Sequence, residues 1–315
     1  MNGRLNERLS GRHKRNISGI LVLDKPPGMT SNAALQHVRR LFQADKAGHT
    51  GALDPLATGV LPVCLGEATK LSGYLLDSDK RYAVRAAVGA CTTTGDAEGE
   101  LTRRSDPATL TRAQLEAALP GFTGEVRQRP PMYSALKRDG KPLYELARAG
   151  IEVEREARPV RIDELRITGF EAGAFELDVR CSKGTYIRTL VEDLAAAVGQ
   201  CAHVAALRRT AAGPFAEKDL VTPEALERAA EGGLPALDAL LLPPLAGLAS
   251  WPTVQVGEAS AQRLAHGQAV EAKPGTPGLV AVTGAGGVLL GIADQAADGL
   301  LTPRRWMARP QSAGP

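Results

Sequence analysis

The 315-residue sequence lacks paired cysteines and long apolar runs. Its four cysteines are scattered and form no Cys-x-x-Cys pair; they are Cys64, Cys91, Cys181 and Cys201. Three of them lie beside apolar or strand-like runs, so we expect reduced, mostly buried thiols in a cytoplasmic protein, and neither a zinc site nor a disulfide framework. No run approaches the roughly 18–20 apolar residues that a membrane span needs, so we expect no membrane contact.

Cofactor-binding patterns are also missing. The sequence has no P-loop, no Rossmann glycine pattern and no metal-ligand spacing, and its five histidines are dispersed. We therefore expect a protein that works without a cofactor or a metal. The net charge of +3 is only weakly basic, so any contact with nucleic acid must come from local clusters of Lys and Arg.

Length and composition fit one large and one small globular domain. Hydrophobic residues make up 43% of the chain and charged residues 23%, which is ordinary for a globular protein. Residues 1–18 are basic and lack an apolar core, so they predict a flexible basic tail rather than a secretory signal. Contact of this tail with nucleic-acid phosphates is the alternative.

The most informative stretch is residues 46–62, where glycines and a proline surround one carboxylate, Asp54. Glycine permits positive φ and close backbone approach, and Pro55 biases Asp54 toward an extended conformation. The apolar run Val60–Leu65 that follows predicts a buried strand. Asp54 is therefore expected on a tight loop leading into the core. A turn whose Asp only bonds local amides is the alternative.

Periodicity predicts the elements around this loop. A buried strand begins at Gly19, a helix is capped by Ser31, and alternate residues of 80–89, Tyr82 among them, face one side of a strand. A helix from Thr185 to Gly199 carries Tyr186 and Arg188 in its first turn. Further strands are predicted at 159–170, 175–181 and 203–210. By pattern alone, such a Tyr packs in the core and such an Arg lies on the surface.

Basic and aromatic residues alternate in the stretch 126–144. Aromatic rings can stack on bases while basic groups hold phosphates, each stacked base contributing about 1–3 kcal/mol. The residues concerned are Arg127, Arg129, Lys137, Arg138 and Lys141, together with Tyr133 and Tyr144. A solvated, proline-bent loop is the alternative.

The sequence pattern changes after a linker predicted at Pro243-Pro244. From about Trp251 onward, a helix-like stretch (259–266) precedes short apolar runs that Gly and Pro separate. This pattern predicts a small β-rich domain.

Four motifs in this sequence resemble those of the TruB family of tRNA pseudouridine synthases. They are Gly48-His49-Thr50-Gly51 with Leu53-Asp54-Pro55, Lys80-Arg81-Tyr82, Pro130-Pro131-Met132-Tyr133-Ser134-Ala135-Leu136-Lys137, and Gly184-Thr185-Tyr186-Ile187-Arg188. The resemblance implies an α+β pseudouridine synthase fold with a largely antiparallel central sheet and a PUA-like C-terminal domain. The domains implied are a tail at 1–18, a catalytic domain at 19–244 with an RNA-gripping insertion at 127–158, and an RNA-binding domain at 250–309.

The resemblance also implies an activity: isomerisation of the T-loop uridine of tRNA (position 55) to pseudouridine by base flipping. It implies no cofactor, no metal, no guide RNA and no obligate protein partner. A monomer in the cytoplasm is the default expectation. Asp54 is the implied catalytic carboxylate; whether it attacks C1′ or takes a sugar proton stays open. Arg188 would lower the pKa of Asp54 and orient it, and Tyr186 would receive or relay the C5 proton.

The remaining site residues follow from the same resemblance. Tyr82 would stack on the flipped uracil, and His49 would fill the gap in the RNA or stack on a neighbouring base. Leu207, Lys25 and Arg208 are expected to bind the nucleotide. Arg129, Tyr133, Lys137 and Tyr144 are expected to contact RNA from the insertion.

Three other functions are alternatives to this one. A guide-dependent rRNA pseudouridylase shares the catalytic loop, but the bacterial-style insertion at 131–150 argues against it. A non-catalytic RNA-binding protein or tRNA folding chaperone stays open, and both roles could coexist with catalysis. A glycoside hydrolase usually needs two carboxylates, and the motifs here carry one.

Overall fold

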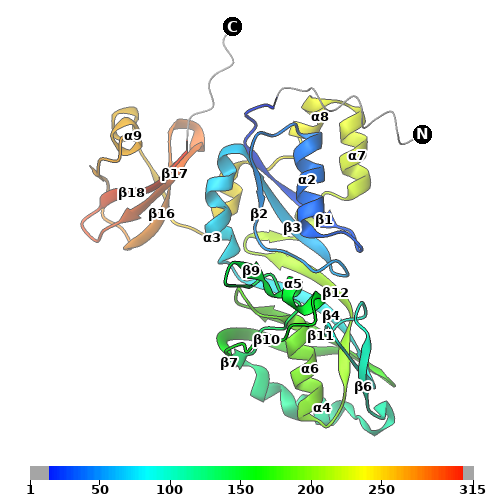
Figure 1. The fold of residues 1–315 in the computed structure, drawn as a ribbon. Helices are drawn as coiled ribbons and strands as arrows, with labels where there is room; N and C mark the ends of the chain where they lie inside the picture. Colours follow the sequence, from blue (N-terminus) through cyan, green and yellow to red (C-terminus); the bar gives the residue numbers. More distant parts are fainter. Residues whose placement is uncertain (1–13, 308–315) are drawn as a thin grey trace.

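The computed structural model describes residues 14–307, and its largest element is one sheet of nine strands (Figure 1). Seven strands follow the order β1-β3-β12-β4-β11-β10-β7, while β2 pairs with β3 and β13 with β12. Every pairing is antiparallel except that of β3 with β12, so the predicted largely antiparallel sheet is confirmed. The strands are β1 (Gly19–Lys25), β2 (Ala47–His49), β3 (Thr58–Leu65), β4 (Lys80–Val88), β7 (Gly124–Gln128), β10 (Arg158–Glu171), β11 (Ala174–Cys181), β12 (Ala202–Ala212) and β13 (Phe215–Ala216).

Strands β1 and β3 lie between two apolar clusters, and alternate side chains enter each cluster. Successive strand residues point to opposite faces. Leu21 and Leu23 therefore join one apolar cluster, whereas Ile20 and Val22 join another. Because both faces of these strands are covered, their sequences are almost continuously apolar.

Helices cover the two ends of the sheet (Figure 1). Beside β1 and β3 lie α2 (Ser31–Leu41), α7 (Pro223–Glu231) and α8 (Leu234–Asp238). Toward the other end lie α4 (Arg112–Ala118) and α6 (Ile187–Ala197), and α6 packs on β12. The active-site candidates lie between these two layers of helices.

Two helices begin at residues other than those predicted. Thr30, not Ser31, caps α2, because the Thr30 hydroxyl accepts the Ala33 amide proton at 3.1 Å. The Ser31 hydroxyl is instead turned toward the loop that carries Asp54. Helix α6 starts at Ile187 with Tyr186 as its N-cap, two residues later than the predicted Thr185.

The parallel contact between β3 and β12 depends on a glycine. Gly59 is the register partner of Arg209, and its φ of +98° lies in the region that favours glycine. A Cβ at Gly59 would lie 2.3 Å from the carbonyl oxygen of Arg209. No larger residue fits there without moving one strand, so Gly59 lets the Asp54 loop enter the sheet beside β12.

A second sheet of five strands follows in the C-terminal part, in the order β14-β16-β17-β18-β15. Its elements are β14 (Thr253–Gln255), α9 (Glu258–Ala265), β15 (Val270–Glu271), β16 (Gly278–Thr283), β17 (Leu289–Gln295) and β18 (Leu300–Trp306). It packs against the 3-10 helix η1 (Gly66–Leu71) and helix α3 (Ser72–Leu76): the Trp251 ring meets the Tyr74 ring edge-on at 5.3 Å, and Lys70 Nζ donates to the Trp306 carbonyl at 2.8 Å. The predicted small β-rich unit is confirmed.

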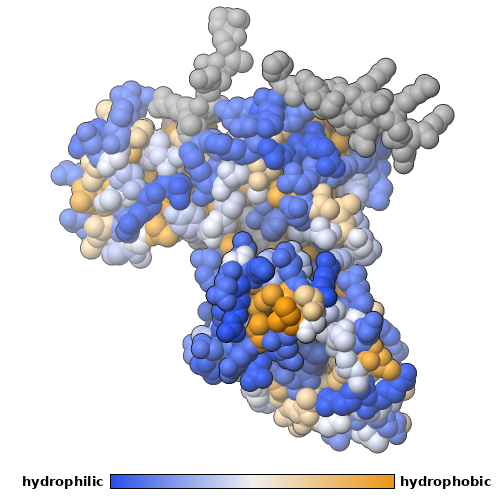
Figure 2. Space-filling view, in the orientation of Figure 1, coloured by the Kyte–Doolittle hydropathy of each residue, from blue (hydrophilic) through white to orange (hydrophobic). Residues whose placement is uncertain are grey.

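The predicted insertion forms a small protrusion. It contains β8 (Lys137–Arg138), β9 (Lys141–Pro142) and α5 (Leu143–Arg148). Where Figure 1 draws β9 and α5, Figure 2 shows an apolar patch bordered by hydrophilic residues. Ile151, just beyond α5, is 49% exposed. The protrusion therefore offers apolar and basic groups to the outside together.

The remaining short elements connect these parts. They are β5 (Ala90–Thr92), β6 (Leu101–Arg104), and the 3-10 helices η2 (Pro107–Thr109), η3 (Leu119–Phe122), η4 (Glu217–Asp219), η5 (Pro244–Leu248) and η6 (Ala285–Gly287). The four cysteines are free; three are buried and Cys91 is half-buried. Among residues 14–307, none of the helices combines the length and apolarity that crossing a membrane requires.

The N-terminal tail predicted at 1–18 falls mostly outside the described residues. Within them, Arg15 Nε donates to the Phe42 carbonyl at 2.9 Å, and Arg15 also pairs with Asp238. The chain is therefore anchored to the ends of helices α2 and α8 already at Arg15.

Candidate active site

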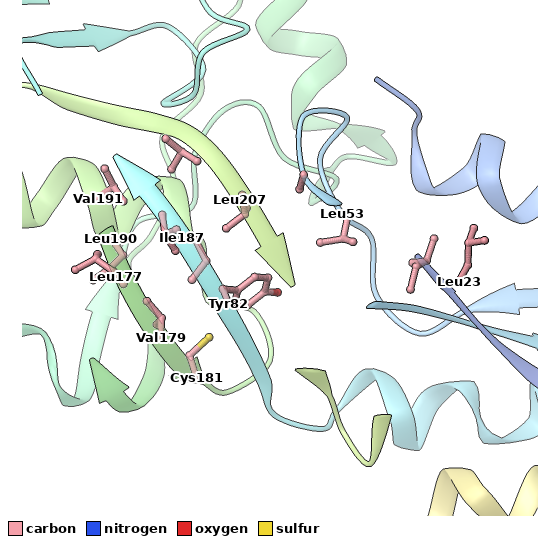
Figure 3. Close-up of a cluster of buried hydrophobic side chains, with 14 of the residues drawn as sticks. Leu23, Leu53, Tyr82, Leu177, Val179, Cys181, Ile187, Leu190, Val191 and Leu207 are labelled. Atoms are coloured by element: carbon pink, nitrogen blue, oxygen red, sulfur yellow. The ribbon is translucent and has the colours of Figure 1, made fainter. Parts of the chain in front are cut away.

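A pocket of about 550 Å³ opens where the Asp54 loop, β4, β12 and the start of α6 meet. Asp54, Tyr82, Tyr186, Arg188 and Leu207 all line it. Figure 3 shows Leu53, Tyr82 and Leu207 approaching one another from the loop, from β4 and from β12. The structure thus brings together five predicted site residues that lie up to 153 positions apart, from 54 to 207.

The centre of the pocket is a two-point ion pair between Asp54 and Arg188. Arg188 Nε lies 3.0 Å from Asp54 Oδ2, and Arg188 Nη2 donates to Oδ1 at 3.2 Å. The Arg188 side chain is 5% exposed, whereas that of Asp54 is 37% exposed. Two parallel bonds fix the carboxylate plane, so Asp54 presents its open side to the pocket in a defined orientation.

Arg188 is itself held by several segments. Its Nη1 donates to the Thr94 carbonyl at 2.7 Å and its Nη2 to the Tyr133 carbonyl at 2.8 Å. The carboxylate of Asp96 lies 3.7 Å from Nη1. The guanidinium therefore joins α6, the 93–96 turn and the insertion to the Asp54 loop. The sequence analysis missed Asp96, which carries no recognisable motif.

Burial outweighs the ion pair in setting the proton affinity of Asp54. Desolvation raises the pKa of Asp54, Arg188 lowers it, Asp96 raises it, and the net shift is upward. Arg188 lowers this pKa as expected, but the larger effect of burial leaves the net shift upward. A carboxylate with a raised pKa is a stronger base and nucleophile than an ordinary one.

Backbone hydrogen bonds brace the loop on both sides of Asp54. The Ser31 hydroxyl accepts from the Leu53 amide at 2.7 Å and donates to the Leu53 carbonyl at 3.1 Å. Lys25 Nζ donates to the carbonyls of Pro26 at 2.8 Å and Pro55 at 3.2 Å. Lys25 is fully buried, which lowers its pKa to about 8 although Asp54 opposes the shift. The structure thus places Lys25 behind the loop and not in the pocket.

Arg209 braces the other end of the same loop. Its Nε donates to the Val60 carbonyl at 2.7 Å and its Nη2 to the Gly51 carbonyl at 3.0 Å. Arg209 is 1% exposed and lines the pocket. The sequence analysis missed it, although the strand period could have found it: if Leu207 faces the pocket, so does the residue two positions further on.

Arg208, which we had expected to bind the nucleotide, lies on the opposite face of β12. Its Nη1 donates to Asp24 at 3.0 Å and its Nε to Glu217 at 2.6 Å. The structure does not bring it into the pocket with Leu207.

Two phenols, those of Tyr82 and Tyr186, line the same pocket as Asp54. Tyr82 is 9% exposed, and burial raises its pKa while Arg209 lowers it. Tyr186 is half-buried, and burial raises its pKa as well. Gln128, also missed from the sequence, accepts from the Tyr186 amide at 3.0 Å. Both phenols therefore stay protonated at neutral pH, as ring surfaces and proton donors.

His49 lies at the edge of the site on β2. Its Nδ1 accepts from the Gly51 amide at 3.4 Å, and burial lowers its pKa. A neutral imidazole ring beside the loop suits the predicted stacking role better than a charge contact.

The insertion residues take different positions. Tyr133 supplies a backbone carbonyl to Arg188, and the neighbouring Ser134 and Ala135 line the pocket. Arg129 and Lys137 are exposed. Tyr144, in α5, lies under the Arg148 guanidinium at 5.5 Å. The insertion therefore closes one wall of the pocket and carries exposed cations next to it.

At its centre, the pocket offers one carboxylate, that of Asp54, for a reaction at one carbon atom of a substrate. Asp96, the second acid near Arg188, is 3% exposed and accepts from the Glu98 amide at 3.1 Å. It is occupied within the protein, unlike the paired acids of a glycoside hydrolase. Within the described part of the chain, no group of three or more His, Cys, Asp or Glu side chains could hold a metal ion.

Three family models match consecutive parts of this chain. Residues 39–187 match the model of the TruB family pseudouridylate synthase (N terminal domain), and residues 188–248 match the tRNA pseudouridylate synthase B C-terminal domain. Residues 252–307 match the model described as Pseudouridine synthase II TruB, C-terminal. The matches cover the second sheet and every strand of the first sheet except β1.

Curated relatives and solved structures agree with these matches. Proteins named tRNA pseudouridine synthase B from Stutzerimonas stutzeri (strain A1501) and Pseudomonas aeruginosa (strain UCBPP-PA14) are each 58% identical over 297 residues, 93% of this chain and 97% of theirs. A chain of a Cbf5-Nop10-Gar1 complex is 25% identical with a TM-score of 0.71, covering 92% of this chain and 84% of that chain. A chain of an H/ACA RNP bound to a substrate RNA containing 2'-deoxyuridine has a TM-score of 0.72 at 23% identity, covering 94% and 87%, a likeness of fold.

Proposed function

Since the chain belongs to the TruB family of pseudouridine synthases, we propose that it isomerises the T-loop uridine of tRNA in the pocket around Asp54. Its activity is the conversion of a tRNA uridine to pseudouridine, and its fold is the pseudouridine synthase fold with a PUA-like C-terminal domain. The observation that carries the assignment to this pocket is the two-point Asp54–Arg188 pair among Tyr82, Tyr186 and Leu207.

The reaction replaces one bond to C1′ of the ribose with another and transfers one proton. The bond from N1 of uracil to C1′ breaks, the base turns, and a bond from C5 to C1′ forms; the C5 proton leaves and N1 gains one. Asp54 is the carboxylate at C1′, and its raised pKa makes it the stronger base or nucleophile. Arg188 holds it in one orientation throughout, because the guanidinium is fixed by backbone carbonyls on two other segments.

The two tyrosines take different roles. Tyr82, at the floor of the pocket, stacks on the uracil and offsets the few kcal/mol that flipping costs. Tyr186 keeps its proton at neutral pH, so it relays the C5 proton and does not accept it as a phenolate. Leu207 forms the apolar wall behind the base.

Outside the pocket, the proposal follows the domain scheme. Residues 19–244 form the catalytic domain, the insertion at 127–158 closes on the RNA through Arg129, Tyr133, Lys137 and Tyr144, and residues 250–309 add an RNA-binding domain. His49 stacks against the RNA next to the flipped base, and Lys25 supports nucleotide binding by holding the Pro55 carbonyl of the Asp54 loop. The protein works as a monomer in the cytoplasm, without guide RNA, cofactor or metal.

The test is pseudouridine formation on an unmodified tRNA transcript without added metal or guide RNA. Asp54→Asn keeps the shape of the side chain and removes its charge, so we expect a loss of more than about a thousandfold in rate. Binding of tRNA should persist. The control is Asp163→Asn, which removes a carboxylate paired with Arg161 on β10, away from the pocket.

Product from wild type and Asp163→Asn alone supports an Asp54-dependent synthase that needs no partner. Product from Asp54→Asn at the wild-type rate would refute the role of Asp54. No product from any variant, with tight tRNA binding retained, would point to an RNA-binding protein instead.

A further inference from the structure

The charges that line the pocket do not balance. Four cations and two carboxylates line it: Lys80, Lys183, Arg188 and Arg209, with Asp54 and Asp77. The excess of two positive charges (four minus two) favours an anionic ligand. Uracil is neutral, so this excess serves some other part of the substrate.

Three of the four cations are committed to the protein. Arg188 holds Asp54, and Arg209 donates to the carbonyls of Gly51 and Val60. Lys80 is 7% exposed, and its Nζ donates to the carbonyls of Leu76 and Ser78. Lys183, at 57% side-chain exposure, is the pocket-lining cation that solvent reaches.

Lys183 lies at the rim, opposite Asp77. The β4–β11 register pairs Lys80 with Cys181, so the loop before β4 and the loop after β11 meet at one end of the sheet. Asp77 comes from the first loop and Lys183 from the second, and Lys183 Nζ lies 2.8 Å from Asp77 Oδ1. Gly184, next to Lys183, has a φ of +80° and open space around it, so nothing crowds the tip of this turn.

We propose that Lys183 binds the phosphodiester beside the flipped nucleotide, and that Asp77 holds the Lys183 ammonium in place until RNA arrives. The inference rests on the proposed function. A base that enters the pocket brings its own backbone to the rim. There a phosphate can replace Asp77, because an ion pair as exposed as this one, at 57% and 59%, contributes little by itself. Lysine is a common point-charge ligand for phosphate.

Asp77 then has a measurable effect of its own. Asp77 orients the Lys183 ammonium, but its own negative charge also repels the incoming phosphate. Asp77 therefore lowers the affinity for RNA. Removing Asp77 and removing Lys183 should change RNA affinity in opposite directions. If the pair only stabilised the two loops, removing either Asp77 or Lys183 would weaken RNA binding or leave it unchanged.

The experiment measures the equilibrium affinity for an unmodified tRNA transcript as a function of salt concentration. Each phosphate contact adds close to one unit to the slope of log K against log salt. We expect Lys183→Gln to weaken binding several-fold and to flatten this slope by about 0.7–1. Lys183→Arg should keep the slope, and Asp77→Asn should tighten binding without flattening it.

Controls and a double variant complete the design. Lys218→Gln removes an exposed lysine that does not line the pocket, and it should leave the slope unchanged. In the Lys183→Gln background, Asp77→Asn should tighten binding less than in wild type, because no ammonium remains for it to release. Circular dichroism spectra and unfolding temperatures confirm that each variant is folded.

An unchanged slope in Lys183→Gln, or equal flattening in Lys218→Gln, would overturn the inference. So would weaker binding in Asp77→Asn. Pseudouridine formation by wild type is measured on the same transcript. Its absence counts against the proposed function, whereas product with an unchanged slope counts against Lys183 alone.

Discussion

At the residue scale, the position of Asp54 depends more on backbone carbonyls than on charge. Arg188 meets the carboxylate directly, but Lys25, Ser31 and Arg209 hold the loop by bonding its main chain. A carboxylate attached to a loop fixed at Gly51, Leu53 and Pro55 has little freedom left beyond its own χ angles. Misplacement by as little as 1 Å can lower a rate a hundredfold, so such bracing is a catalytic requirement.

Arg209 and Arg208 allow this bracing to be tested with adjacent residues. Arg209→Lys keeps the charge but leaves one donor group for the carbonyls of Gly51 and Val60. We expect a drop of about 10–100-fold in the single-turnover rate of pseudouridine formation. The dissociation constant for tRNA should not change, because Arg209 is buried and bonds only to protein groups.

Arg208→Lys is the matched control, since the pairs of Arg208 with Asp24 and Glu217 lie on the opposite face of β12. Its rate should stay near wild type. Equal losses in the two variants would show that the strand, and not the contact of Arg209 with the loop, sets the rate.

At the element scale, α6 carries Arg188 at its start and a carboxyl group of unusual proton affinity one turn later. Burial raises the pKa of Glu192 to about 7, with Asp193 adding to the shift and Arg188 opposing it. The folded protein therefore holds a proton on Glu192 between the ordinary pKa of 4.5 and about 7, where the unfolded chain does not.

Because of this proton, the contribution of Glu192 to stability falls as pH rises. Below pH 4.5 the group is protonated in both states, and as pH rises toward 7 the folded state loses its advantage, so Glu192 contributes a fall in stability across that window. Glu192→Gln stays neutral and should remove this contribution. Thermal unfolding of both proteins between about pH 5 and pH 7 measures the difference.

Glu231→Gln, an exposed change at the end of α7, should leave the pH dependence as in wild type. If Glu192→Gln shows the wild-type slope, the group titrates normally in the folded state.

The parallel junction of β3 and β12 makes a prediction about two glycines. Both Gly59 and Gly184 have positive φ, but a Cβ at Gly59 would lie 2.3 Å from the Arg209 carbonyl oxygen, while nothing lies within 4 Å at Gly184. Gly184→Ala should therefore lower the free energy of unfolding by about 1–2 kcal/mol through backbone strain alone. Gly59→Ala adds overpacking and should cost about 3 kcal/mol or more. Urea titration of both variants compares them, and equal losses would refute the steric argument.

How far the sequence predicts these elements depends on whether the cause is local. The alternation in β4 and the apolar stripe of α6 are written in neighbouring residues, so both elements were predicted within two residues of their observed ends. The convergence of Asp54, Tyr82, Tyr186, Arg188 and Leu207 was reached through family resemblance, since no local pattern joins segments this far apart.

What escaped the sequence analysis is the support of the site. Ser31, Gln128 and Arg209 bond to backbone groups, and a backbone amide or carbonyl partner has no sequence signature. Lys25 was named from the resemblance as a nucleotide-binding residue, but its contact with the Pro55 carbonyl has no sequence signature either. For the pKa of Asp54, the effect of Arg188 could be anticipated, whereas the effect of burial could not, because burial is a property of the fold.

At the scale of the whole molecule, the two sheets share one apolar cluster. Leu289 and Ile292 of the C-terminal sheet and Met307, just after it, lie in one cluster. The same cluster contains Val22 of β1, Leu71 of η1 and Leu75 of α3. The C-terminal part is therefore not attached by a linker alone. Contact between the two sheets keeps the PUA-like domain at a fixed distance from the pocket.

Shared packing implies shared unfolding. We expect one cooperative transition for the wild-type protein in calorimetry, because exposing the C-terminal sheet also exposes Leu71 and Leu75. Trp251→Ala removes the ring that meets Tyr74 edge-on, and it should lower the stability by about 2 kcal/mol or resolve the transition into two. Leu279→Ala, an exposed position on β16, should change neither. Two separate transitions already in wild type would mean that the interface is too weak to couple the sheets, and the distance between the pocket and the C-terminal domain would then be set by RNA and not by the protein.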